Sequence, residues 1–430
     1  MKIPAHQKQS NPNKLFYGWV IVFGGALMSG LSGGLNFYGF SAFFVPLSQE
    51  FGWSRTALSG VISLARLEGG FLGPLEGYLA DKFGPRKVMI VGIPLMGTGF
   101  ILLSQVQSLL SFYLVYILAI TLGSALGTFV PVNAAIAHWF IRKRSRAFGL
   151  VMSGIGIGGA IFLPILGWTI ATYGWRPAAV MGGILIWVIG LPVTAIMRHK
   201  PEQYGQYPDG IEPFNLEENH YNLLDSKEPK SEQFEPEFGP LRALRTSAFW
   251  ILGASVALRA LVTTGFTIHF VAMMVDRGFS LPVASSLLGW VALLSLSGRI
   301  GLSWIGDFVE KRYLLTGALL VMAVTLVAMS FADSFLTFMI ILVIYSTAYG
   351  GSIVLPLPIQ GDYFGKNSFA TIRGLLSTVQ TIGMMIGPIF AGVVYDLTES
   401  YFIAFLGFAV AAVLGALVLL FLRKPSPLKA

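Results

Sequence analysis

The chain has 430 residues, of which 54% are hydrophobic and only 12% are charged, and its mean hydropathy is +0.70. Soluble domains carry about 25% charged residues, so this composition excludes a soluble enzyme and predicts an integral membrane protein. The net charge of +8 fits contact with anionic lipid headgroups and does not imply nucleic acid. The absence of cysteine excludes disulfides and thiol chemistry.

Long apolar segments follow one another along the whole chain, each able to span roughly 30 Å of hydrocarbon as a helix. The alternation of polar and apolar residues typical of a membrane barrel is absent. We therefore predict an all-α membrane protein with twelve transmembrane helices. The spans are expected at about 17–46, 54–80, 87–105, 109–140, 146–172, 176–198, 247–273, 281–307, 313–331, 335–360, 370–396 and 400–422.

The distribution of lysine and arginine predicts the orientation of these helices. Of the 29 basic residues, 23 fall on the side that carries both termini, three on the other side and three inside spans. Cytoplasmic loops of membrane proteins are enriched in lysine and arginine. We therefore expect both termini in the cytoplasm and the protein in the plasma (inner) membrane. The first span is too long to be a cleaved signal sequence.

A polar stretch over residues 199–246 is rich in acids and prolines and is predicted to be a flexible cytoplasmic linker. It separates six spans from six spans. The predicted organisation is a cytoplasmic tail (1–16), an N-terminal six-helix half (17–198), the linker (199–246), a C-terminal six-helix half (247–422) and a second cytoplasmic tail (423–430).

The two halves resemble each other in sequence. Asp81 and Arg86 after the second span recur as Asp307 and Arg312 after the eighth, at a common offset of 226 residues. Two pseudo-symmetric halves joined by a linker are the geometry of alternating access, with the ligand at the repeat interface near the membrane midplane.

The stretch from Gly77 to Lys87 resembles the loop 2–3 signature of the major facilitator superfamily, with a degenerate copy around Asp307. The resemblance covers all twelve spans and implies that fold.

Asp81 stands at a helix end, where its carboxylate can pair with cations and with the amides of a neighbouring helix start. This predicts a gate, with a static loop brace as the alternative. The gating residues are Gly77, Asp81, Arg86, Asp307 and Arg312.

Three further regions are similar to the monocarboxylate transporters and the bacterial oxalate:formate antiporters. They comprise residues 16–19 with 46–55, residues 139–149, and residues 269–278. This resemblance implies a secondary transporter of small carboxylates.

Three arginines, Arg66, Arg259 and Arg299, fall near the middle of apolar spans. A charge at this depth costs about 2.5–3.5 kcal/mol and marks a functional site by default. Only Glu68 is an equally deep acid, so the buried excess is positive and points to an anionic ligand. The resemblance implies a carboxylate-binding arginine at Arg299, whose guanidinium can hold a carboxylate with two hydrogen bonds. A structural bridge from Arg299 to Asp307 or to carbonyls is the alternative.

The roles of the other deep polar residues stay open between two interpretations. Arg259 is either a second clamp on the substrate or a partner of Glu68, and Arg66 lies about 200° around its helix from Glu68. Glu68 is either a proton carrier or a permanent salt-bridge partner of Arg66 or Arg259. His269 is either a proton relay or a buried side chain satisfied by hydroxyls and amides of other helices.

The resemblance also implies aromatic rings and a tyrosine hydroxyl opposite the span 8 arginine. The counterparts here are Phe37, Tyr38, Tyr116, Tyr345 and Tyr349. Ser295 takes a position that is often polar or acidic in the monocarboxylate branch. Gln380 takes the place of a span 11 lysine in the oxalate:formate antiporters. A neutral amide there favours a monoanion such as lactate or pyruvate, unless Arg66 or Arg259 supplies the second charge.

No enzyme signature, phosphate-binding loop or metal-ligand cluster is present, so we expect no enzymatic activity, cofactor or metal. The sequence predicts a monomeric secondary active transporter of small organic anions, most simply monocarboxylates, coupled to protons or to a counter-anion. An exchanger of the oxalate:formate type and a drug or metabolite efflux carrier remain alternatives.

Overall fold

The computed structural model describes residues 16–210 and 238–425, apart from Arg142, Asp307, Asp333, Lys366 and Asn367. All regular secondary structure in these residues is helical, which confirms the predicted fold class. Eleven of the described segments are long and apolar enough to cross a membrane. The second predicted span forms a further long helix, α3, whose Arg66, Glu68 and Glu76 make it more polar than the others.

The N-terminal half contains the first six predicted spans. The first and fourth spans change from α- to π-helix and back, and π-helical segments occur frequently at functional sites. The elements are α1 (Gly18–Leu31), the π-helix η1 (Ser32–Phe37), α2 (Phe40–Phe51), α3 (Arg55–Phe83), α4 (Pro85–Leu103), α5 (Leu109–Leu114), the π-helix η2 (Val115–Thr121), α6 (Leu122–Ser124), the π-helix η3 (Ala125–Phe129), α7 (Val130–Trp139), α8 (Arg144–Tyr173) and α9 (Trp175–Ile196).

The C-terminal half contains the last six predicted spans. Its tenth span divides into two helices just before Pro356, which takes the first helical position of the second one. The elements are α12 (Ser247–Asp276), α13 (Leu281–Ile305), α14 (Lys311–Ser330), α15 (Phe335–Val354), α16 (Pro356–Phe364), α17 (Phe369–Thr398) and α18 (Phe402–Leu420).

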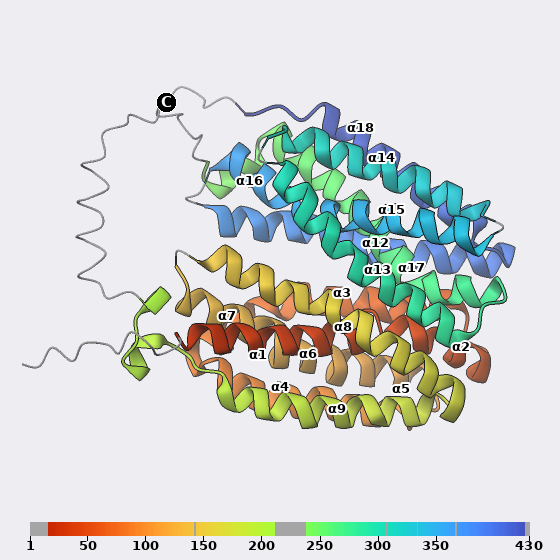
Figure 1. Cartoon of the computed structure of the whole chain (residues 1–430), viewed down its shortest axis with the longest axis horizontal. Coiled ribbons are helices and arrows are strands. Elements are labelled where there is room, and N and C mark those ends of the chain that lie inside the picture. The colour runs from red at the N-terminus through yellow and green to blue at the C-terminus, as the bar shows by residue number, and fades with distance from the viewer. Residues whose placement is uncertain are drawn as a thin grey trace, which may run out of the picture.

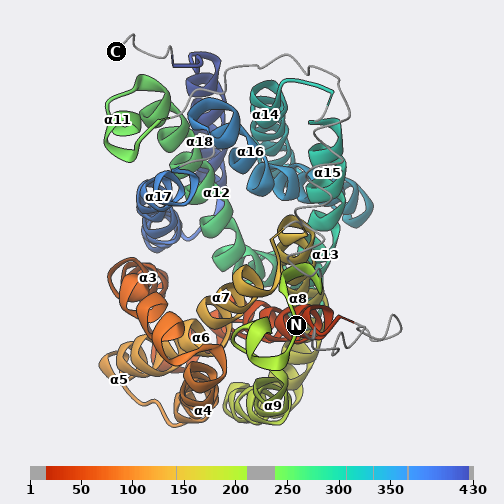
Figure 2. The same ribbon diagram turned by 90° about the vertical axis from the view of Figure 1, so that its left-hand side faces the viewer.

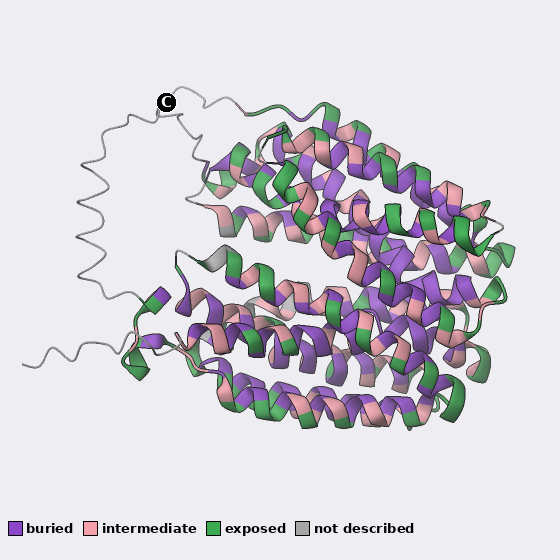
Figure 3. Cartoon of the chain, in the orientation of Figure 1, coloured by how far each residue is buried: buried purple, intermediate pink, exposed green. Residues whose placement is uncertain are grey.

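The two halves lie side by side and meet through few helices. Helix α3 packs against α17, α8 against α13, and α2 against α12. Figure 2 shows the first two of these pairs on opposite sides of the interface. In Figure 1 the halves converge at one end and diverge toward the end where α1 begins and α18 ends. We call the convergent end the outer end. Buried residues line the inner faces of the helices (Figure 3).

Both described ends of the predicted linker pack against the helical halves. The first end forms the short helices η4 (Pro201–Tyr204) and η5 (Pro208–Gly210), and the second forms α11 (Pro240–Leu244). The Asp209 carboxylate accepts hydrogen bonds from the backbone of Ile141 at 3.0 Å and of Lys143 at 3.2 Å. The Phe238 amide donates to the Phe364 carbonyl at 3.1 Å. These ends are therefore held in place; the linker's residues 211–237 lie outside the described part of the chain.

Candidate functional site

Arg299 lies on α13 at a point where the backbones of α13 and α15 touch. A Cβ atom at Gly298 would lie 1.7 Å from the Thr347 carbonyl oxygen, and one at Gly350 would lie 1.8 Å from a carbonyl oxygen of α13. Glycine at both positions allows this close approach of the two helices beside Arg299. Its half-buried guanidinium donates from Nη1 to the Met152 carbonyl on α8 at 3.4 Å, while Nε has no hydrogen-bond partner.

The other two deep arginines also have unused donors. Arg259 on α12 is only 5% exposed, and its Nε makes no hydrogen bond. The Nε of Arg66 on α3 is likewise without a partner, and its guanidinium carbon lies 5.0 Å from the centre of the Phe37 ring. Among the described residues, none of the ion pairs involves Arg66, Arg259 or Arg299.

Two tyrosines link the halves between these arginines. The hydroxyls of Tyr38, just after η1, and Tyr349, on α15, lie 3.3 Å apart. Tyr349 is an electrostatic neighbour of both Arg66 and Arg259, and Tyr38 is an electrostatic neighbour of Arg299. The structure thus brings the three predicted arginines together around one tyrosine pair.

The remaining predicted aromatics surround this pair. Tyr345 stacks on Tyr349 with ring centres 6.1 Å apart, and its fully buried hydroxyl has no hydrogen-bond partner. Tyr116 on η2 donates to the Asn36 side chain on η1 at 2.9 Å. Asn36 was not among the predicted site residues, although a polar residue close to two glycines in the first span was a usable signal.

Glu68 makes neither of the salt bridges that were considered for it. Both of its carboxylate oxygens are buried and accept no hydrogen bond from the described residues. Glu76, two turns later on α3, is 3% exposed, has one oxygen without a hydrogen-bond partner, and is an electrostatic neighbour of Glu68. The alternative in which Glu68 is permanently paired with Arg66 or Arg259 is therefore not what the structure shows.

Ser295 and Gln380 differ in how far they are available to a ligand. Ser295 is fully buried and donates its proton to the Ala292 carbonyl of its own helix at 2.7 Å. Gln380 on α17 is half-buried, and its Oε1 has no hydrogen-bond partner.

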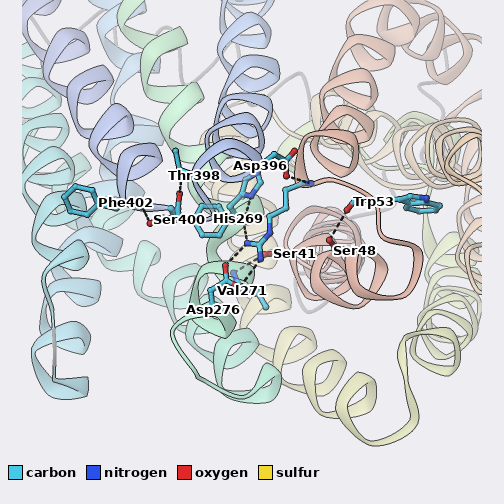
Figure 4. A network of polar contacts seen from close by, with 12 residues as sticks. Ser41, Ser48, Trp53, His269, Val271, Asp276, Asp396, Thr398, Ser400 and Phe402 are labelled. Atoms are coloured by element: carbon cyan, nitrogen blue, oxygen red, sulfur yellow. Dashed lines mark hydrogen bonds and ion pairs between the residues drawn. The ribbon is translucent and has the colours of Figure 1, made fainter.

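The outer end is closed by a polar network between the halves. Arg55 at the start of α3 holds Asp276 of α12 through Nη1 and Nη2, at 2.8 and 2.9 Å. Asp396 near the end of α17 accepts from the backbone amides of Arg55 and Thr56, both at 2.9 Å, and from the Thr56 hydroxyl at 2.6 Å. Figure 4 shows Asp276, Asp396 and His269 converging here.

His269 is a fully buried member of this network. Its Nδ1 lies 2.9 Å from the Tyr401 hydroxyl, and its Nε2 lies 3.0 Å from the Ser59 hydroxyl and 2.9 Å from the Pro388 carbonyl. Burial raises the pKa of the Tyr401 phenol, which lies between α17 and α18, so this phenol stays protonated and can donate. These contacts match the interpretation of a satisfied histidine, and the relay role stays a prediction.

The predicted gating residues at the opposite end are only partly visible. Gly77 is half-buried and Arg86 is exposed, whereas the Asp81 side chain and Asp307 lie outside the described part of the structure. Arg312 forms an ion pair with Glu310, with 3.2 Å between Nε and Oε1. The gate at this end therefore stays a prediction.

Arg373, near the start of α17, is a further cation close to the arginine cluster. It is half-buried on α17, its Nη1 is buried without a partner, and it is an electrostatic neighbour of Arg259. Its place inside the predicted span 370–396 was the available signal.

Comparison with known proteins identifies close counterparts of this architecture. The family model described as Major Facilitator Superfamily matches residues 25–309 and 252–430. Monocarboxylate transporter 13 of Rattus norvegicus is 27% identical over 398 residues, covering 90% of this chain and 85% of that protein. Monocarboxylate transporter 4 of the same species is 26% identical over 415 residues, covering 94% and 82%. These relatives are transporters and not enzymes.

Solved structures share the fold. A bacterial homolog of the human lysosomal transporter Spinster, in an inward-facing and unoccupied conformation, superimposes with a TM-score of 0.69 at 16% identity, covering 96% of this chain and 95% of that one. The same protein in an inward-facing and occupied conformation also scores 0.69. The family match, the transporter relatives and the two-half helical fold together place this multi-pass membrane protein in the major facilitator superfamily.

Proposed function

We propose that this protein is a secondary active carrier of small organic anions, most simply monocarboxylates, that works by alternating access. The observation that carries the proposal is the meeting of Arg66, Arg259 and Arg299 around the Tyr38–Tyr349 pair, with no carboxylate partner among the described residues. Buried charges without partners are costly. A substrate carboxylate would supply the missing negative charge. The names of the relatives support the same substrate class.

In this mechanism Arg299 anchors the carboxylate, and the halves rock around the bound substrate. The outer network holds the halves together in the state described here, while they diverge at the end that carries the termini. With the termini in the cytoplasm, as the basic residues predict, this state faces inward. Glu68, which forms no ion pair among the described residues and has the Glu76 carboxyl as an electrostatic neighbour, would take up the coupled proton from the cytoplasmic side.

Exchange of dicarboxylates such as oxalate is a second candidate function. Gln380 lacks the charge of the lysine expected in oxalate:formate antiporters, but Arg66 and Arg259 both lie beside Tyr349. They would supply the second cation for a dianion.

Uptake of labelled lactate, pyruvate and oxalate into proteoliposomes tests these proposals. Monocarboxylate uptake stimulated by an inward proton gradient is expected for the wild type and should fall at least tenfold in Arg299→Gln. Arg423→Gln, which removes an exposed arginine beyond α18, is the matched control and should transport normally. Normal uptake by Arg299→Gln would eliminate this residue as the anchor, and oxalate uptake without monocarboxylate uptake would favour the exchanger.

A further inference from the structure

We propose that Asp396 is the outer latch residue of the transport cycle, closing the outer end by capping the first turn of α3 from the opposite half and releasing it when the carrier opens outward. The inference needs alternation between two open sides, and its test rests on the proposed cytoplasmic location of the termini; neither depends on which anion is carried.

The chemistry of the contact is that of a helix cap. The first amides of a helix have no partner within the helix, and its N-terminus carries a partial positive charge. Ser54 satisfies one of these donors from within the N-terminal half, accepting from the Ala57 amide at 3.1 Å. The Asp396 carboxylate satisfies two more, with the Thr56 hydroxyl as a third donor. The N-terminus of α3 is therefore complete only when the two halves are in contact.

The contact between Asp396 and the α3 amides tolerates less movement than the neighbouring Arg55–Asp276 ion pair. Arg55 reaches Asp276 with a long side chain that can stretch as the helices separate. The amides of Arg55 and Thr56 are fixed in α3, and the aspartate that reaches them has a short side chain. A shift of α17 away from α3 by little more than 1 Å would break these hydrogen bonds together, since it would take donor and acceptor beyond the usual range of about 2.7–3.2 Å. The contact is therefore suited to act as a switch.

The contact between α3 and α17 also buries Ser63, a position at which separation of the two helices can be detected. Further along the seam, Ser63 of α3 is 2% exposed and donates to the Met385 carbonyl of α17 at 2.7 Å. Because the chain contains no cysteine, Ser63→Cys would be its only thiol. In the latched state this thiol is shielded from the outer side.

The test measures labelling of Ser63→Cys by a membrane-impermeant maleimide applied to the outer side of intact cells. Adding Asp396→Ala should raise the labelling rate at least tenfold, and Asp396→Asn, which keeps an acceptor but no charge, should raise it less. Glu50→Gln is the matched control, because Glu50 also accepts hydrogen bonds at the outer end, but from Trp175 and Arg176 of its own half. Its labelling rate should equal that of Ser63→Cys alone.

A purely structural cap would give a different result. Asp396→Ala protein that is monodisperse in size-exclusion chromatography but labels no faster would overturn the proposal, as would an equal increase in Glu50→Gln. If Asp396→Ala does not fold, Thr56→Val removes one of the three hydrogen bonds and should raise labelling by a smaller factor. Unchanged labelling in Thr56→Val and Asp396→Asn would then count against the latch.

Discussion

Charged groups have hydrogen-bond or ion-pair partners at the outer end of the interface between the halves, whereas several lack them in its centre. At the outer end, Arg55, Asp276 and Asp396 partner one another or the backbone across the interface. In the centre, Arg299 and Glu68 leave donors and acceptors unused. Buried polar groups normally find partners, so unused ones need an explanation. In a closed gate the polar groups satisfy one another, whereas in a binding site the ligand would satisfy the groups that lack partners.

A bound anion should stabilise the protein by completing the central site. An anion that completes the centre should stabilise the wild-type protein against thermal unfolding, by about 2.7 kcal/mol at a concentration one hundred times its Kd. The stabilisation should disappear in Arg299→Gln and persist in Arg423→Gln. Thermal unfolding of purified protein in detergent, titrated with pyruvate or oxalate, measures it. Equal stabilisation of both variants would place the anion elsewhere.

Glu68→Gln tests whether the unused acid serves proton coupling. The amide cannot bind and release the coupled proton, so stimulation of uptake by a pH gradient should be lost. Exchange of labelled for unlabelled substrate at equal pH should continue at a rate within a few fold of wild type, because the arginines are intact. Both rates are measured in the same proteoliposomes. Retained gradient stimulation would exclude Glu68 as the carrier of the proton.

A pair of tyrosine variants gives the smallest expected effect. Tyr349→Phe removes a hydroxyl from the centre, and a hydrogen bond contributes about 0.5–1.5 kcal/mol. The KM for substrate should therefore rise about threefold to tenfold. Tyr401→Phe removes a hydroxyl from the outer network, where it contacts Arg55 and His269, and should leave the KM near the wild-type value. Initial uptake rates measured over a range of substrate concentrations distinguish the two. A larger change in Tyr401→Phe would contradict the comparison.

Much of the fold follows from local features of the sequence. Each span can be predicted from the length of its apolar segment, and the deep arginines are conspicuous because the residues around them are apolar. The different directions of Arg66 and Glu68 follow from helical geometry alone. In the structure the Arg66 guanidinium carbon lies 5.0 Å from the centre of the Phe37 ring. The switch to π-helix in η1 and η2 is not visible in this way, because it depends on how neighbouring helices pack.

The parts that escaped prediction depend on contacts between distant segments. Asp396 lies near the end of its span and looks like an ordinary polar boundary residue; only the packing of α17 on α3 makes it a cap. His269 similarly finds Ser59 and Tyr401 on helices and loops far away in the sequence. Arg373 lies near the start of α17, where a basic residue usually marks the cytoplasmic side. Only the packing of α17 against α12 also makes it an electrostatic neighbour of Arg259.

In the proposed transport cycle, the arginines that form no ion pair among the described residues also make the process sensitive to the membrane potential. A charge that crosses the full membrane potential changes its energy by about 2.3 kcal/mol per 100 mV. As the halves rock, the empty carrier turns its positive cluster from one bulk solution toward the other. A potential that is negative inside would draw the empty carrier toward the inward-facing arrangement, while a bound anion would offset part of that pull. Voltage would therefore act mainly on the return of the unloaded protein.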